Sequence, residues 1–378
     1  MNFFLLLFCA LISVYTVGCA DKNEITEQKL INAPIESYQN ELLGIAFESV
    51  SAMPVEPHIK SRSSAQELVV KTCLELDQPK RALGYIKQID NWRRQLCYAD
   101  LALYCAHYGF EKADVQYFLN LAAQVPNNTE DWRKEQVDIK IDQTNAYLGQ
   151  TKLISGSFER EMQDYEKLVS TGDFDAIENV LNEYSRLYKQ YYNDVGRRTL
   201  IEEKIKSSWE KMPVLFRIEL LMKMAGYSID NKDKAKAIEL INQAGKMMDS
   251  FNWPVRSEIP LRAQLAKLRF KLGENEKAQT ELQEVLNIFE KNKEIIVNIE
   301  KAGILRSIAE AYQAIGDTIR SGNIYKQAIE AGIENPNSRP RSEDLSVTCC
   351  SMALYKFKPD TELFNRIKDI KISLNDPW

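Results

Sequence analysis

A tryptophan followed by a glycine seventeen residues later occurs three times in this chain, and this repetition restricts the fold more than any other feature. The three pairs are Trp92 and Gly109, Trp132 and Gly149, and Trp209 and Gly226. Asn, Asp or Ser precedes each tryptophan, and these residues cap the N-termini of helices, whereas glycine is favoured just after a helix ends. We therefore predict that each tryptophan opens a helix of about 16 residues and that Gly109 and Gly149 close theirs.

The tryptophans also recur at the length of a helical hairpin. Trp92 and Trp132 are 40 residues apart, and Trp209 and Trp253 are 44 residues apart. With only 15 Gly and 12 Pro in 378 residues, the chain has few of the residues that interrupt helices, and this favours long helices over many short strands. A repeat of this length is typical of proteins that stack helical hairpins in a row.

A second pattern places small and large apolar residues at fixed distances from a turn residue. Around Gly316 it consists of Ala309, Tyr312, Tyr325 and Ala328. Related patterns surround three further turn residues, namely Asp77, Gly109 and Gly273. Together they resemble the tetratricopeptide repeat (TPR) family over most of residues 62–337, with each copy degenerate. The resemblance implies stacked antiparallel hairpins with a concave surface that binds protein or peptide.

We predict an all-α chain, namely an α-solenoid of antiparallel helical hairpins with degenerate TPR-like repeats and about 14–18 helices. The repeat array is expected over residues 62–337. Residues 21–61, which contain three prolines, are expected to form a tether and an N-terminal cap. Residues 338–378 are expected to form C-terminal capping helices, with Trp378 packed against the last repeat.

The first twenty residues have the composition of an export signal. Residues 3–12 are almost wholly apolar, and this stretch is shorter than a transmembrane helix, which needs about 20 apolar residues. The residues before Cys19 resemble the bacterial lipobox, in which a signal peptidase cleaves before a cysteine that then carries lipid. We expect residues 1–20 to hold this signal, Cys19 to be the lipidation site, and the protein to be anchored in a bacterial cell envelope. Cleavage after Ala20, giving a soluble periplasmic or secreted protein, remains the alternative.

The composition and the short motifs exclude several classes of function. The 49 Lys and Arg residues are balanced by 54 Asp and Glu residues, whereas a nucleic-acid-binding protein would show a clustered basic excess. The chain has only two histidines, and it lacks the sequence motifs of zinc hydrolases, serine hydrolases and nucleotide-binding proteins. We therefore expect a non-enzyme with no cofactor, no metal site and no nucleic-acid partner.

One segment carries the candidate binding residues, because its tyrosines recur at the spacing of a single helix face and two arginines follow them. As a hypothesis, we assign ligand or partner binding to Tyr184, Tyr188, Tyr191, Tyr192, Arg197 and Arg198. Tyrosine rings that face solvent can hold a peptide or stack on a sugar. In the alternative interpretation, the same stripe packs this helix against its neighbour.

Two pairs of cations stand at predicted helix starts, where the helix dipole disfavours positive charge. They are Arg93-Arg94 and Arg133-Lys134. Their repetition predicts either ion pairs between helices or a repeated patch for an acidic partner.

The function that best fits these features is that of a non-catalytic envelope lipoprotein or secreted protein, which binds a protein or peptide partner on a TPR-like concave surface. A first alternative is a lipoprotein that captures glycans or other solutes through the tyrosine stripe. A second alternative is a helical (α/α) hydrolase or lyase, since long helical hairpins also occur in those enzymes.

Overall fold

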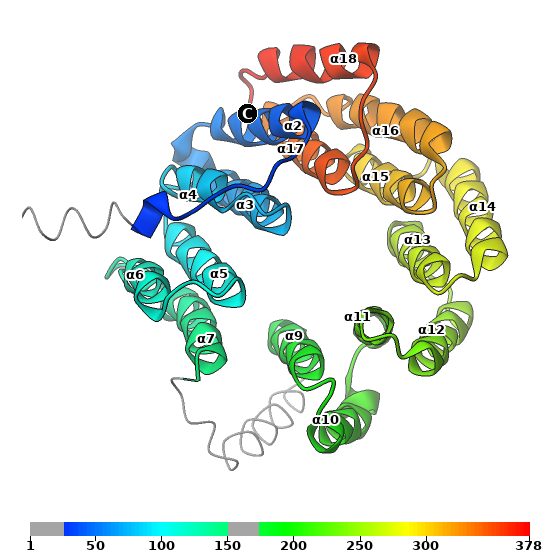
Figure 1. Cartoon of the computed structure of the whole chain (residues 1–378). Coiled ribbons are helices and arrows are strands. Elements are labelled where there is room, and N and C mark those ends of the chain that lie inside the picture. Colours follow the sequence, from blue (N-terminus) through cyan, green and yellow to red (C-terminus); the bar gives the residue numbers. More distant parts are fainter. Residues whose placement is uncertain (1–25, 150–173) are drawn as a thin grey trace, which may run out of the picture. The chain divides into compact units, whose positions relative to one another are not determined.

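The computed structural model describes residues 26–149 and 174–378, so the predicted signal segment and Cys19 lie outside the described residues. The described part of the chain forms seventeen helices and contains no strand (Figure 1). All are α-helices except one short 3-10 helix. The helices pack in neighbouring pairs, which confirms the predicted all-α helical repeat fold, and their number falls within the predicted range.

The chain divides into two compact units, and the first combines residues 1–152 with residues 336–378. Its described helices are α2 (Ser37–Ser51), α3 (Val55–Glu75), α4 (Pro79–Ile86), α5 (Arg93–His107), α6 (Lys112–Ala122), α7 (Asp131–Tyr147), α17 (Ser338–Leu354) and α18 (Thr361–Ile372). Helices α3, α5 and α7 pack side by side in a row, and α4 and α6 cover one side of this row (Figure 1).

The second unit spans residues 153–335 and is therefore an insertion between α7 and α17. Its described helices are α9 (Phe174–Gln190), α10 (Val195–Ser208), the 3-10 helix η1 (Trp209–Lys211), α11 (Val214–Asp230), α12 (Lys234–Asp249), α13 (Val255–Lys271), α14 (Asn275–Asn292), α15 (Asn298–Ala314) and α16 (Thr318–Ile333). The loops within the hairpins α11–α12, α13–α14 and α15–α16 are short, so that consecutive helices are antiparallel neighbours. Fully buried alanines such as Ala237 and Ala278 allow the paired helices to approach closely.

The predicted helix ends at Gly109 and Gly149 are confirmed. Helices α5 and α7 end two residues before these glycines, whose φ angles are 73° and 67°. Asp77 holds the same left-handed conformation after α3, with φ 55°, which Asp tolerates better than most residues.

The third tryptophan–glycine pair does not form the predicted helix. Trp209 lies in η1, the next helix begins at Val214, and Gly226 is inside that helix. Pro213 at the N-cap explains the difference, because its fixed φ and missing N–H favour the start of a helix there.

Residues 26–51, which fall in the segment expected to form a tether and an N-terminal cap, are part of the folded unit 1. Leu30 is only 1% exposed, and eight of the fifteen residues of α2 are buried. Lys29 Nζ donates to Asp114 Oδ2 at 2.7 Å, and this contact attaches the segment to α6.

The C-terminal helices pack against the N-terminal helices of unit 1. Helix α17 contacts α2 and α3, and Gln39 Nε2 donates to the Ala353 carbonyl oxygen at 2.8 Å. Trp378 packs against Val50, Met53 and Ala65 rather than against the last repeat, so its predicted location was wrong. The two ends of the chain meet in one core, which local sequence patterns do not reveal.

Candidate functional site

The tyrosine stripe lies in the core of unit 2. Tyr184 and Tyr188 are 0% exposed, and Tyr191 and Tyr192 are also buried. The Tyr188 hydroxyl donates to Glu202 Oε1 at 3.2 Å, and the Tyr192 hydroxyl donates to Asp233 Oδ2 at 3.0 Å. Rings in this position have no free face for a ligand, which favours the packing interpretation of the stripe.

The two arginines of the same segment cover the edge of this core. The Arg197 guanidinium lies 4.7 Å from the Tyr191 ring centroid, and that of Arg198 lies 4.8 Å from the Tyr192 centroid. Arg198 Nη1 also donates to the Tyr192 carbonyl oxygen at 3.0 Å. These cation–π contacts tie the first turn of α10 to the turn that follows α9 and give both arginines a structural role.

The cations at the starts of α5 and α7 take part in two different kinds of contact. Arg93 forms an ion pair with Glu67 of α3, which is the predicted pairing between helices. Arg133 instead lies over two rings, at 4.9 Å from the Trp132 centroid and 5.8 Å from the Trp92 centroid. Lys134 pairs with Asp131 within its own helix, at 3.7 Å.

Polar and aromatic side chains of α3, α5 and α7 and of the residues at their ends contact one another along the row, and we call this set the row face. It comprises Glu67, Lys71, Asp77, Trp92, Arg93, Asp100, Tyr104, His107, Tyr108, Trp132, Arg133, Lys140 and Tyr147. The three helices are parallel, because residues near the N-terminus of one helix contact residues near the N-terminus of the next, and the C-terminal ends meet in the same way. Examples are the pairs Trp92–Trp132 and His107–Tyr147. The row face consequently has three levels.

The first level, at the helix starts, is aromatic and cationic. Trp92 and Trp132 meet edge to face with centroids 5.9 Å apart, and Trp132 remains half exposed. The repeated tryptophans therefore join α5 to α7, in addition to marking where the helices begin.

The second level is a network of ion pairs. Lys71 Nζ donates to Glu67 Oε1 at 2.6 Å, Arg93 binds the other oxygen of Glu67, and Lys140 binds Asp100. Burial raises the pKa of Glu67, but the charges of Lys71 and Arg93 outweigh it and hold that pKa below its usual value. The Glu67 carboxylate is therefore ionised at neutral pH. The ion pairs of Glu67 and Asp100 join the three helices.

The third level, at the helix ends, is acidic and aromatic. The rings of Tyr104 and Tyr108 are stacked with centroids 4.3 Å apart, and both hydroxyls donate to Asp77 Oδ1. The His107 and Tyr147 rings meet edge to face at 4.5 Å. Tyr108 and Tyr147 are more than half exposed.

The cysteines of the described residues are buried free thiols. Burial raises the pKa of Cys105 to about 12 and raises the pKa values of Cys73, Cys97 and Cys349 as well. Because the thiolate is the nucleophile, thiols of this kind are inert, and they fill the core. Within residues 26–149 and 174–378, no cluster of His, Cys, Asp and Glu is suited to hold a metal ion.

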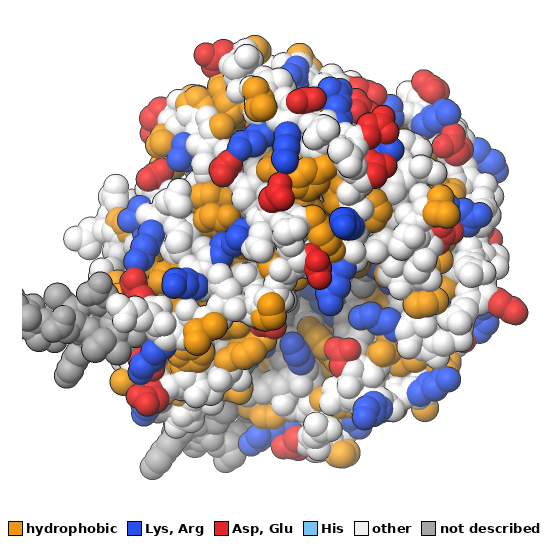
Figure 2. Space-filling view, turned by 45° about the horizontal axis from the view of Figure 1, so that its top comes forward, with side chains coloured by type: hydrophobic (Ala, Val, Ile, Leu, Met, Phe, Trp, Pro, Cys, Tyr) orange, Lys and Arg blue, Asp and Glu red, His pale blue; other side chains and the backbone are white. Residues whose placement is uncertain are grey.

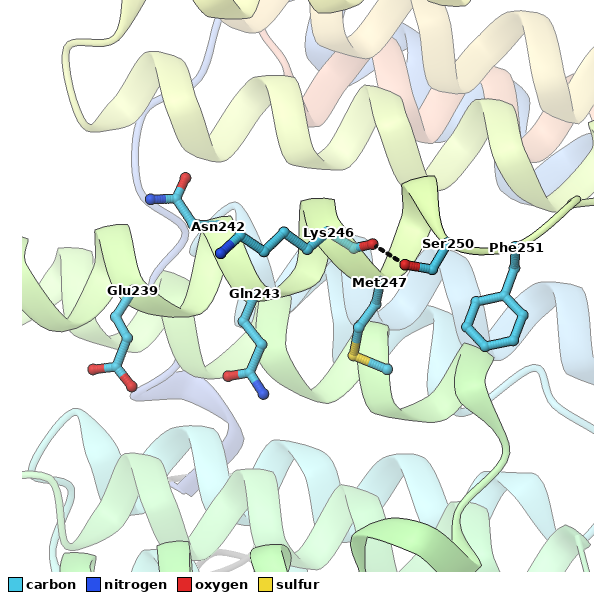
Figure 3. A pocket seen from close by; sticks show the side chains of 7 residues that line it. All are labelled: Glu239, Asn242, Gln243, Lys246, Met247, Ser250 and Phe251. Atoms are coloured by element: carbon cyan, nitrogen blue, oxygen red, sulfur yellow. Dashed lines mark hydrogen bonds between the residues drawn. The ribbon is translucent and has the colours of Figure 1, made fainter.

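A hollow of about 440 Å³ runs along the exposed face of α12 (Figure 3). Its lining residues are Glu239, Asn242, Gln243, Lys246, Met247, Ser250 and Phe251. All of them belong to one helix and the two residues after it, so the hollow has a wall on one side only. On the face seen in Figure 2, basic and acidic side chains are interspersed, in line with the balanced composition.

The fold and the row face define a helical repeat protein with an exposed polar and aromatic surface. No protein-family model matches this sequence, and no curated protein matches it. The described residues contain no helix that is both long and apolar enough to cross a membrane. Sequence reasoning missed the row face, although the spacing of Arg93, Asp100 and Tyr104 along one side of a predicted helix was a usable signal.

Proposed function

We propose that this protein is a non-catalytic, TPR-like interaction protein of a bacterial cell envelope, held there by a lipid on Cys19. It binds an acidic segment of a partner protein at the second level of the row face of unit 1. The second level of that face, formed by Glu67, Lys71, Arg93, Asp100 and Lys140, carries the proposal.

The key observation is that the cations of this level face solvent more than the carboxylates do. The side chain of Lys71 is 42% exposed against 7% for Glu67, and that of Lys140 is 28% exposed against 12% for Asp100. A partner therefore meets the ammonium groups first, and the carboxylates beneath them hold those groups in place. Each ammonium group has three donors, so it can bind a second carboxylate without releasing the first.

Replacing Lys71 and Lys140 together with Gln is expected to weaken partner binding about tenfold or more, because each solvent-facing ion pair contributes up to about 1 kcal/mol. Gln retains an amide donor for the carboxylate below. We would place a photo-crosslinking amino acid at Ile139, an exposed residue of α7, in the full-length protein. The crosslinked product should fade in the double variant and at high salt.

The same crosslinker at Ile319, an exposed residue of α16 in unit 2, is the control for non-specific capture. A product specific to Ile139 that persists undiminished in the double variant would contradict the role of the lysines. The absence of any product specific to Ile139 would count against the row face as the binding surface.

The lipid anchor has its own test. Cys19→Ala is expected to move the protein from the membrane fraction to the soluble fraction, because the lipid chains supply the membrane affinity. Cys9→Ala, which changes a cysteine inside the apolar stretch, is the matched control and should stay with the membrane. Fractionation followed by immunoblotting measures both, and unchanged membrane retention of the Cys19 variant would refute the anchor.

A further inference from the structure

The third level of the row face has the features of a carbohydrate site, and the buried tyrosine stripe of unit 2 does not. We propose that Asp77, Tyr104 and Tyr108 form a subsite for a neutral sugar ring, with Tyr147 as a second platform for an oligosaccharide. This inference rests on different residues from the acidic-partner site and stands independently of it.

The Tyr108 ring is a rigid platform with one free face. Its other face is backed by Tyr104, since the two rings are 4.3 Å apart and inclined by only 22°. The side chain as a whole is 58% exposed. A sugar has an apolar face of C–H bonds that packs on such a ring, because the face of the ring carries the negative part of its quadrupole.

Asp77 fixes the two tyrosines and supplies an acceptor beside them. Both hydroxyls donate to its Oδ1, and the distance from Tyr104 is 3.2 Å. The Asp77 carbonyl oxygen accepts from the Ala33 N–H at 2.8 Å, so the N-terminal segment holds this residue in place. Its Oδ2 can then accept a sugar hydroxyl, and the two phenol oxygens retain lone pairs for further hydroxyls.

The tyrosine hydroxyls remain protonated donors. Burial and the neighbouring Asp77 raise the pKa of Tyr104, and the hydrogen bond to Asp77 raises that of Tyr108. A neutral ligand with both donors and acceptors matches this group better than an anion, which would meet the charge of Asp77.

The arrangement of the rings distinguishes a sugar from an organic cation. A cation such as an ammonium group is held best where several ring faces point at one centre. Here two rings are stacked nearly parallel and leave a single flat face, which suits a flat ligand. Tyr147, on the next helix of the row, is 54% exposed, and its ring meets that of His107 edge to face with centroids 4.5 Å apart. It offers a second platform for a further sugar unit.

The test is calorimetric titration of the full-length protein, kept in a detergent without a sugar headgroup. The probes are maltohexaose, cellohexaose, xylohexaose and chitohexaose, with tetramethylammonium chloride as the cationic comparison. We expect at least one hexasaccharide to bind and tetramethylammonium not to bind. Tyr108→Ala should weaken that binding about tenfold or more.

Trp132→Ala, which removes a half-exposed ring at the other end of the row, is the matched control and should bind like the parent. A melting curve for Tyr108→Ala should resemble the parent's, because the side chain is mainly exposed. The proposal is overturned if no hexasaccharide binds at millimolar concentration, or if only tetramethylammonium binds. It is also overturned if Tyr108→Ala binds like the parent or if Trp132→Ala weakens binding equally.

Discussion

Removal of residues 336–378 is expected to unfold unit 1, because helix α17 is part of its core. Eleven of the seventeen residues of α17 are buried, and the helix covers α2 and α3. Truncation would uncover the side of α2 that carries Gln39, on which Leu42 and Leu43 are 0% exposed. Burial of one such side chain contributes about 1.5–3 kcal/mol, and a domain is stable by only about 5–15 kcal/mol in total.

Limited proteolysis followed by mass spectrometry measures this effect. Cleavage sites within residues 26–149 should become accessible in the truncated protein, whereas those within residues 174–335 should stay protected, because they belong to a separate compact unit. The matched control ends at Leu374 and therefore keeps α17 and α18 but lacks Trp378. It should fold and melt at a lower temperature, because Met53 loses its cover. If unit 1 stayed fully protected without residues 336–378, the packing of α17 on α2 and α3 would not be required for unit 1 to fold.

Tyr188→Ala is expected to destabilise unit 2 by about 3–5 kcal/mol, the cost of deleting a buried aromatic ring. Tyr188 is 0% exposed and meets the Tyr192 ring edge to face at 5.5 Å. Tyr188→Phe keeps the ring and loses only the hydroxyl, which donates to Glu202, so that it should cost about 0.5–1.5 kcal/mol. Chemical denaturation of the full-length protein, followed by proteolysis of the unit 2 segment, measures both values.

Lys189→Ala is the control for this series, because Lys189 follows Tyr188 on the same helix and its side chain is exposed. Its change should stay within about 0.5 kcal/mol, as for most surface substitutions. If Tyr188→Ala were as stable as the parent, the ring would not be a core element, and the ligand-binding interpretation of the stripe would regain its basis.

Local chemistry explains why much of the fold was predictable. A glycine that takes a left-handed φ ends a helix wherever it occurs, and for this reason Gly109 and Gly149 marked the ends of α5 and α7 correctly. The same reasoning failed at Trp209, where Pro213 a few residues later provides a stronger start signal. The tryptophan pattern was thus a reliable guide only where no competing helix signal stood nearby.

The candidate binding residues show what periodicity cannot decide. Tyr184 and Tyr188 recur at helical spacing, and so do Asp100 and Tyr104, yet the first pair is core and the second pair lines an exposed face. A helical period tells which residues share a side of a helix, but a neighbouring helix must be placed before that side is known to be covered. The side of α9 that carries Tyr184 and Tyr188 is covered by α11. The side of α5 that carries Asp100 and Tyr104 has no helix packed over it in the α3–α5–α7 row.

The sequence by itself determined the helical class, the hairpin length and most of the turn positions, because these depend on residues a few positions apart. Only the tertiary structure decided that α17 belongs with α2 and that residues 26–35 pack on unit 1, since both depend on contacts between residues far apart in the chain. It also brought Asp77 to the hydroxyls of Tyr104 and Tyr108, from a turn 27 and 31 residues away. No short-range pattern carries that information, because the partners are chosen by packing.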